Sequence, residues 1–222
     1  MTAGIESYAP IGDGRTVALI GLDGSVDWLP LPDLTSTPVF ARLLDSETGG
    51  CLELTPTEDY ETTRRYVPDT NVLETTFTTA RGSVTVTDAM VSGVAGRMPW
   101  AELARRIDGL DGTVPMAWRI HPGTSLRTAS PWIERTQHGD VIRSGKTALV
   151  VVGFEHGPEA PDPDGTSGPR LTGSFTASKG SRHLIALAAT HDEPLHLPDP
   201  RNVDVGIDRT IDNWRHWSEV FS

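Results

Sequence analysis

Residues 11–30 read IGDGRTVALIGLDGSVDWLP, and this stretch decides the fold. Two short apolar runs, 17–20 and 26–29, flank the sequence Gly21-Leu22-Asp23-Gly24. An Asp-Gly pair supplies the positive φ that a tight hairpin turn requires. The stretch therefore predicts a β-hairpin close to the N-terminus.

The same strand signals recur along the rest of the chain. Residues 71–79 and 84–90 alternate apolar with polar side chains around the turn at 80–83, so we expect them to pair as antiparallel neighbours. Residues 101–109 fit a helix or a strand, and the clean alternation of 114–120 after Asp111-Gly112 favours two strands joined by a turn. Further strands are expected at 51–55, 132–135, 140–143, 147–154, 170–177 and 183–189. Many short strands with frequent turns predict an all-β fold, an antiparallel β-sandwich.

Only two segments predict helices. Residues 37–44 begin with a threonine cap and a proline in the first turn. Residues 207–221 carry apolar side chains at helical spacing, two of them tryptophans. We therefore expect a β-sandwich domain over residues 1–206 and the start of a linker helix over 207–222. That helix either packs on the sandwich or leads into a following domain.

The composition narrows the class of partner. The 222 residues carry a formal net charge of −11, which argues against binding to nucleic acid or to an anionic membrane. The N-terminus lacks the features of a secretory signal, and the longest apolar run, 148–152, is too short to span a bilayer. A cytoplasmic location is the default expectation. Cys51 is the only cysteine, so we expect a small buried side chain rather than a disulfide.

No strong catalytic, metal or cofactor motif is present, so we assign no catalytic residue, no metal ligand and no cofactor. Gly12-Asp13-Gly14 lacks the third glycine of a dinucleotide-binding fingerprint. His183, His191 and His196 share one region but not the spacing of metal ligands.

Four residues near the N-terminus are candidates for contact with a substrate or with another domain: Asp13, Arg15, Asp27 and Trp28. A carboxylate beside an aromatic ring, as at Asp27-Trp28, is a combination that grips a sugar by stacking and hydrogen bonding. The competing interpretation places Trp28 in the core and Asp27 on a turn or a backbone amide. Asp13 and Arg15 could equally form a local salt bridge, which contributes little when exposed. The same two alternatives hold for three other tryptophans, for which we favour the core: Trp100, Trp118 and Trp132.

Several segments, in this order, resemble the N-terminal region of bacterial glycoside hydrolase family 15 proteins, which include glucoamylases and trehalase-like enzymes. The most specific part is the run from Tyr66-Val67-Pro68 to Asn71-Val72-Leu73-Glu74-Thr75. The other segments are 11–30, 38–45, 49–50, 84–90, 173–176 and 214–217.

The resemblance implies a trehalase-like N-terminal β-sandwich domain, of the supersandwich type, followed in the family by a toroid of paired helices that carries the catalytic glutamates. Our first hypothesis is therefore a non-catalytic domain that packs on the helical domain of the same polypeptide and lends a loop to the active-site rim. The alternative is a freestanding carbohydrate-binding module. The resemblance leaves the substrate open between trehalose and maltose- or dextrin-like α-glucosides. We also expect an apolar patch on the isolated domain, through which it could form a homodimer.

Overall fold

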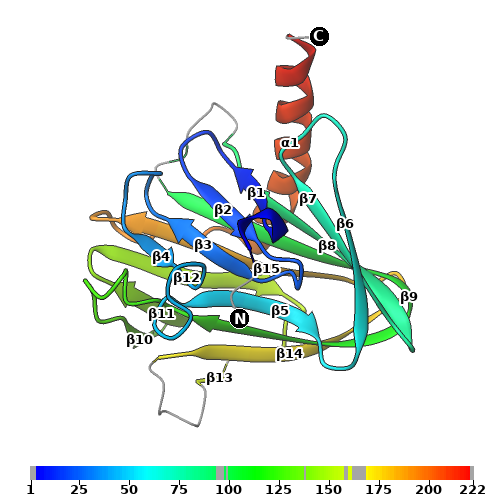
Figure 1. Cartoon of the computed structure of the whole chain (residues 1–222), viewed down its shortest axis with the longest axis horizontal. Coiled ribbons are helices and arrows are strands. Elements are labelled where there is room, and N and C mark those ends of the chain that lie inside the picture. Colours follow the sequence, from blue (N-terminus) through cyan, green and yellow to red (C-terminus); the bar gives the residue numbers. More distant parts are fainter. Residues whose placement is uncertain are drawn as a thin grey trace.

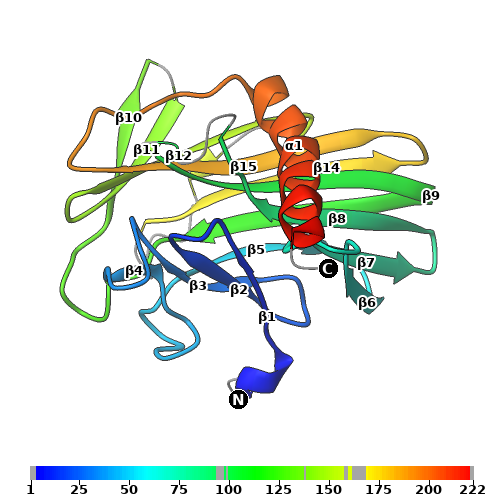
Figure 2. The same cartoon turned by 90° about the horizontal axis from the view of Figure 1, so that it is seen from above.

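The computed structural model describes residues 4–93, 98, 100–137, 139–157, 160–161 and 169–220. Antiparallel strands dominate it, with one long helix near the C-terminus (Figures 1 and 2). The elements are the 3₁₀ turn Ile5–Ser7, β1 (Ala9–Gly12), β2 (Val17–Ile20), β3 (Val26–Pro30), β4 (Pro38–Phe40), β5 (Cys51–Pro56), β6 (Tyr60–Tyr66), β7 (Leu73–Thr79), β8 (Gly82–Met90), β9 (Ala101–His121), β10 (Trp132–Thr136), β11 (Gly139–Ser144), β12 (Thr147–Phe154), β13 (Ala160–Pro161), β14 (Leu171–Ser178), β15 (Arg182–His191) and α1 (Pro200–Glu219).

The long strand β9 joins two layers of sheet. Its first half pairs with β8 and β15, which continue to β7 and β6 on one side and to β12, β11 and β10 on the other. Its second half pairs with β5 and β14, and β5 leads to β3, β2 and β1. The predicted all-β sandwich is confirmed, and the main core contains buried side chains from both groups of strands.

The predicted hairpins are present. β2 and β3 pair antiparallel around the turn that contains Gly24, whose φ is 77°. β7 and β8 pair antiparallel as well. Cys51 is buried at the start of β5, as expected.

Helix α1 crosses the outer face of the β8, β9 and β15 layer and covers a second apolar cluster. Val203 and Ile207 of the helix are buried there against strand residues such as Ala104 and Leu184. The helix then continues beyond the sheets toward the C-terminus (Figure 1). Among the described residues, no helix is both long enough and apolar enough to cross a membrane.

The structure corrects three predictions about the elements. Residues 37–44 are not a helix: Pro38–Phe40 forms β4 on β3, followed by a turn. The Asp111-Gly112 pair does not separate two strands, because β9 is continuous and Gly112 has a φ of 58° within it. Helix α1 begins at Pro200 and not at Ile207, since the Asp199 side chain caps it by accepting a hydrogen bond from the Arg201 amide. Phe221, expected on this helix, lies outside the described residues.

Candidate functional site

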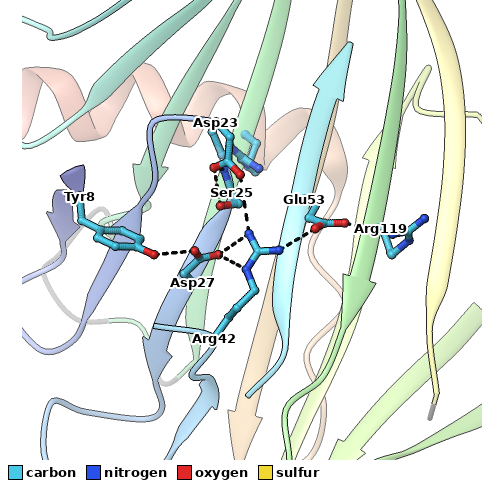
Figure 3. Close-up of polar contacts among 9 residues, drawn as sticks. Tyr8, Asp23, Ser25, Asp27, Arg42, Glu53 and Arg119 are labelled. Atoms are coloured by element: carbon cyan, nitrogen blue, oxygen red, sulfur yellow. Dashed lines mark hydrogen bonds and ion pairs between the residues drawn. The ribbon is translucent and has the colours of Figure 1, made fainter. Parts of the chain in front are cut away.

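A network of charged side chains surrounds Asp27 on β3 (Figure 3). Asp27 is only 6% exposed. Its Oδ2 accepts a hydrogen bond of 2.7 Å from the Tyr8 hydroxyl. Its Oδ1 accepts one of 2.9 Å from Arg42 Nε, and lies 2.7 Å from Arg42 Nη2. Two nitrogens of the Arg42 guanidinium therefore converge on one oxygen of this buried carboxylate, while the Tyr8 hydroxyl occupies the other oxygen.

Arg42 also links Asp27 to the outer face of the neighbouring strands. Its Nη1 lies 2.6 Å from Oε1 of Glu53 on β5, and its Nη2 lies 3.8 Å from Oδ2 of Asp23. Glu53 Oε2 lies 3.4 Å from Nη1 of Arg119 on β9. Three carboxylates and two guanidiniums thus run from the β2–β3 turn across β5 to β9 (Figure 3). We refer to Tyr8, Asp23, Asp27, Arg42, Glu53 and Arg119 as the Arg42 network.

Local sequence explains how these side chains are placed. Asp23 Oδ1 accepts hydrogen bonds from the backbone N–H and the hydroxyl of Ser25, which fixes the β2–β3 turn. The backbone N–H of Leu43 donates to the Asp27 carbonyl, so the turn after β4 is tied to β3 and brings Arg42 to Asp27.

The protonation states suit a binding or packing role. Burial, together with the hydrogen bond to Asp27, raises the pKa of Tyr8 above its usual value, so its hydroxyl remains a neutral donor. Burial raises the pKa of the nearby Cys51 thiol to about 12. A thiol that stays protonated is a poor nucleophile, so Cys51 is not poised for covalent catalysis.

A shallow depression of about 490 Å³ adjoins this network. Glu53 and Arg119 line it, together with Thr55, Thr172 and Ser174. Hydroxyl and charged side chains therefore cover this part of the β5, β9 and β14 surface, which can hydrogen-bond to a polar ligand or to a polar protein surface.

The four predicted residues fall into two separate places. Asp27 belongs to the Arg42 network, whereas Asp13 and Arg15 lie in the turn between β1 and β2. Asp13 Oδ1 accepts hydrogen bonds from the backbone N–H groups of Arg15 and Thr16. The Arg15 guanidinium lies 3.8 Å from Asp13 and also donates to the backbone carbonyls of Met98 and Trp100, at 3.3 and 3.2 Å.

The tryptophans differ in how deeply they are buried. Trp28 is half-buried on β3. Trp118 is buried, as expected, and its indole N–H donates to the carbonyl of His156 at 2.9 Å. Trp100 is half-buried. The core prediction for Trp132 is wrong, because this side chain is 53% exposed on β10.

Sequence reasoning did not single out Tyr8, Arg42 or Glu53. Tyr8 precedes β1, and Glu53 occupies an ordinary alternating position on β5. The sequence predicts a helix over residues 37–44, and no local signal points Arg42 toward Asp27. Among the described residues, no group of three or more His, Cys, Asp or Glu side chains converges in a way that could hold a metal ion.

Comparison with known proteins identifies the family. A model of the trehalase-like N-terminal domain matches residues 1–151. The chain belongs to this family. A trehalase of Mycobacterium tuberculosis is 36% identical to this trehalase-like domain over 97% of the chain, and a trehalase of Thermoplasma volcanium is 26% identical over 98% of it. In both cases the match covers 34% of the relative, so this chain spans about a third of the length of these proteins.

Proposed function

We propose that this chain is the non-catalytic N-terminal β-sandwich domain of a trehalase-type glycoside hydrolase. In this proposal it packs on a helical catalytic domain of the same polypeptide, and the segments around Asp27 and Arg42 contribute to the rim of the active site. Trehalose is the preferred substrate over maltose or dextrins, because the relatives that match the chain are named trehalases. Membership of glycoside hydrolase family 15 follows from the sequence resemblance described above and belongs to the same proposal.

The match to the trehalase-like N-terminal domain carries the family assignment, and the Arg42 network supports the non-catalytic role. A glycosidase of the usual kind needs one carboxyl that gives up a proton and a second that acts as base or nucleophile. Here all three acids of the network, Asp23, Asp27 and Glu53, form ion pairs with the Arg42 guanidinium. This arrangement favours a role in positioning and recognition over a role in proton transfer.

The surroundings of the network favour contact with another domain. Leu22 is 54% exposed beside Asp23, and Leu44 is 65% exposed two residues after Arg42. Both leucines lie next to a residue of the Arg42 network or close to one in the chain, so an apolar contact is available beside the charged groups. We therefore assign Leu22 and Leu44 to the contact with the catalytic domain.

The first experiment measures glucose release from trehalose and from maltose. We expect none from the purified chain, and hydrolysis of trehalose from the product of the whole reading frame that carries this sequence. Release of glucose by residues 1–222 alone would overturn the non-catalytic role. A reading frame that encodes no further domain would instead favour the carbohydrate-binding module.

A second experiment tests the rim. In the product of the whole reading frame, Leu44→Asp should reduce trehalose hydrolysis about 10-fold or more, because it places a charge in an apolar contact. Leu110→Asp is the matched control, since Leu110 is 47% exposed on β9 and lies outside the Arg42 network. Equal activity of the Leu44→Asp and Leu110→Asp proteins would contradict the proposed contact.

A further inference from the structure

A second cavity, of about 340 Å³, lies where the start of β9 meets α1 and the segment that precedes this helix. The polar residues that line it are Trp100, Glu102, His196, Asp199, Asn202 and Arg209. This volume is at the lower end of the range for small-molecule pockets, so it suits a ligand about the size of one ring. It is separate from the Arg42 network.

Glu102 is the most unusual group in this cavity. The residue is only 4% exposed, and burial raises the pKa of its carboxyl above the usual value. Among the described residues, only the Trp100 indole N–H donates a hydrogen bond to this carboxylate, at 3.2 Å. A buried carboxylate with a single neutral donor is costly, so Glu102 is a group for which a ligand hydroxyl would supply the missing donor.

Trp100 is fixed in place from two sides. On one side, the Arg15 guanidinium donates hydrogen bonds to the backbone carbonyls of Trp100 and of Met98, which lies two residues earlier in the chain. The exposed ring of His196 stacks on the indole with the ring centroids 3.8 Å apart and an interplanar angle of 27°. Of the candidates chosen from the sequence, Arg15 therefore helps to position Trp100, and Asp13 contacts Arg15.

The charges in the cavity select a neutral ligand. Arg209 faces Glu102 closely enough to lower its pKa, although burial dominates. Asp199 also lines the cavity, and its carboxylate already accepts a hydrogen bond from the Arg201 amide at the start of α1. A cationic ligand would be repelled by Arg209, and an anionic ligand by Glu102 and Asp199. A polyol satisfies both groups, because its hydroxyls donate to Glu102 and accept from Arg209 and Asn202.

We propose that this cavity is a non-catalytic binding site for a neutral hydroxylated ring of the monosaccharide class, with Glu102 as the main acceptor and Trp100 and Arg209 beside it. Apolar side chains such as Val203 in the lining provide contact for the C–H surface of such a ring. The lining residues named here all come from this chain, so the chain by itself can be used to test the site.

The test follows the indole N–H resonance of Trp100 by NMR during titration of the chain with glucose. Trp100→Phe assigns the resonance. We expect a saturable shift with a Kd on the order of 1–10 mM, as is reasonable for one ring held by a few polar contacts. Methylammonium chloride and inorganic phosphate serve as the cationic and anionic probes, and we expect neither to shift the resonance in this range.

Glu102→Gln is the decisive variant. The glutamine oxygen still accepts from Trp100, and the buried charge is removed, so the fold is retained. Glucose affinity should fall about 10-fold, because a hydrogen bond to a charged acceptor is replaced by a neutral one. Glu193→Gln, at an exposed position before α1, is the matched control and should bind as the unchanged chain does.

Three results would overturn the inference: no saturable shift with glucose, equal affinity in the Glu102→Gln protein, or a shift produced by methylammonium or phosphate instead. These results are independent of the glucose-release assay, so the binding site and the proposed function can fail separately.

Discussion

Arg42 is the residue on which the N-terminal strands converge. It contacts carboxylates from three places in the sequence: the β2–β3 turn, β3 itself and β5. Because Asp27 is buried, its charge depends on this guanidinium and on the Tyr8 hydroxyl for stabilisation. The network therefore contributes to the stability of the hairpin as well as to the proposed rim.

Replacing Arg42 should expose this dependence. We expect Arg42→Met to lower the free energy of unfolding by about 2–4 kcal/mol, because it leaves the Asp27 carboxylate buried beside a neutral side chain. Urea denaturation measures the change. Arg119→Met is the control: its side chain is half exposed and its contact with Glu53 is long, so a loss of less than about 0.5 kcal/mol is expected. Equal losses for the two variants would contradict the importance of the buried pair.

Removing the buried charge of Glu102 should stabilise the folded chain at neutral pH, whereas removing the charge of Arg42 should destabilise it. Its pKa in the folded chain is raised above the usual value of 4.5, so the folded state holds the proton more tightly than the unfolded state. The favourable contribution of this group is fully present below pH 4.5 and is lost as the pH rises through the raised pKa. Glu102→Gln removes this loss. We therefore expect the variant to gain stability relative to the parent chain as the pH rises from 4 toward 7, in denaturation curves measured across this range. A difference that does not change with pH would show that Glu102 is not strained by its burial.

At the scale of elements, Arg106 fixes α1 to the sheet. From β9 its Nε lies 2.5 Å from Oδ1 of Asp204, and its Nη1 lies 2.7 Å from Oδ1 of Asp208. Its Nη2 also donates to the Asp204 carbonyl at 2.5 Å. One guanidinium thus spans a full turn of the helix and sets the direction in which α1 leaves the sandwich.

We expect Arg106→Met to loosen α1 while the strands remain folded. Hydrogen exchange of the helix amides should become faster, and global stability should fall by about 1–3 kcal/mol, because the mostly buried Asp204 loses its shortest ion pair while the exposed Asp208 adds little. Arg182→Met is the matched control: Arg182 also contacts Asp204, but at 3.5 Å and from a half-exposed position. Unchanged protection of α1 in the Arg106→Met protein would contradict this role.

Strand β9 bridges the two layers, and Gly112 allows it to pass from one to the other. Its φ is 58°, and a Cβ at this position would lie 2.0 Å from the carbonyl oxygen of Arg81. Gly180 has a φ of 80° with no atom within 4 Å of such a Cβ. Gly180→Ala therefore isolates the backbone cost, about 1 kcal/mol, whereas Gly112→Ala adds the steric clash and should lose at least about 3 kcal/mol. Thermal unfolding of both variants checks this, and similar losses would show that the crowding at Gly112 is relieved without cost.

At the scale of the whole molecule, α1 is the element that extends away from the sandwich (Figure 1). Its buried residues end at Thr210. Beyond them, Trp214 and Trp217 pack edge to face with ring centroids 5.6 Å apart. Trp217 is 57% exposed and Val220 is 70% exposed. We assign to this end of the helix the apolar patch that the sequence leads us to expect on the isolated chain.

We propose that the chain associates through this surface when no other domain covers it. Light scattering at increasing concentration should show a rise in apparent mass above that of the monomer. Trp217→Ser should reduce the association, because it removes the largest exposed apolar side chain of the helix. Trp132→Ser is the control, since Trp132 is similarly exposed on β10. A strict monomer at all concentrations would contradict the proposal.

The sequence by itself determined the features that depend on neighbouring residues. An Asp-Gly turn between two apolar runs specifies the β2–β3 hairpin. The alternation of apolar with polar positions specifies β7 and β8, because a strand with one solvated face has a period of two. The Asp199-Pro200 start of α1 was also present in the sequence as a cap followed by proline, although the apolar spacing placed the start later.

The tertiary structure alone decided where distant residues meet. Residues 37–44 carry a helix-start signal, yet Val39 and Phe40 are buried in the core and β4 pairs with β3, so packing prevails over the local preference. Asp111-Gly112 continues β9 because this pair lies opposite Gly82 and Ser83 of β8. In the same way, Asp27 could be selected from sequence, but its partner Arg42 could not, and neither could the meeting of Trp100, Glu102 and α1. The physical reason is that hairpin turns and strand alternation act between near neighbours, whereas burial and ion pairing act between residues that only the folded chain brings together.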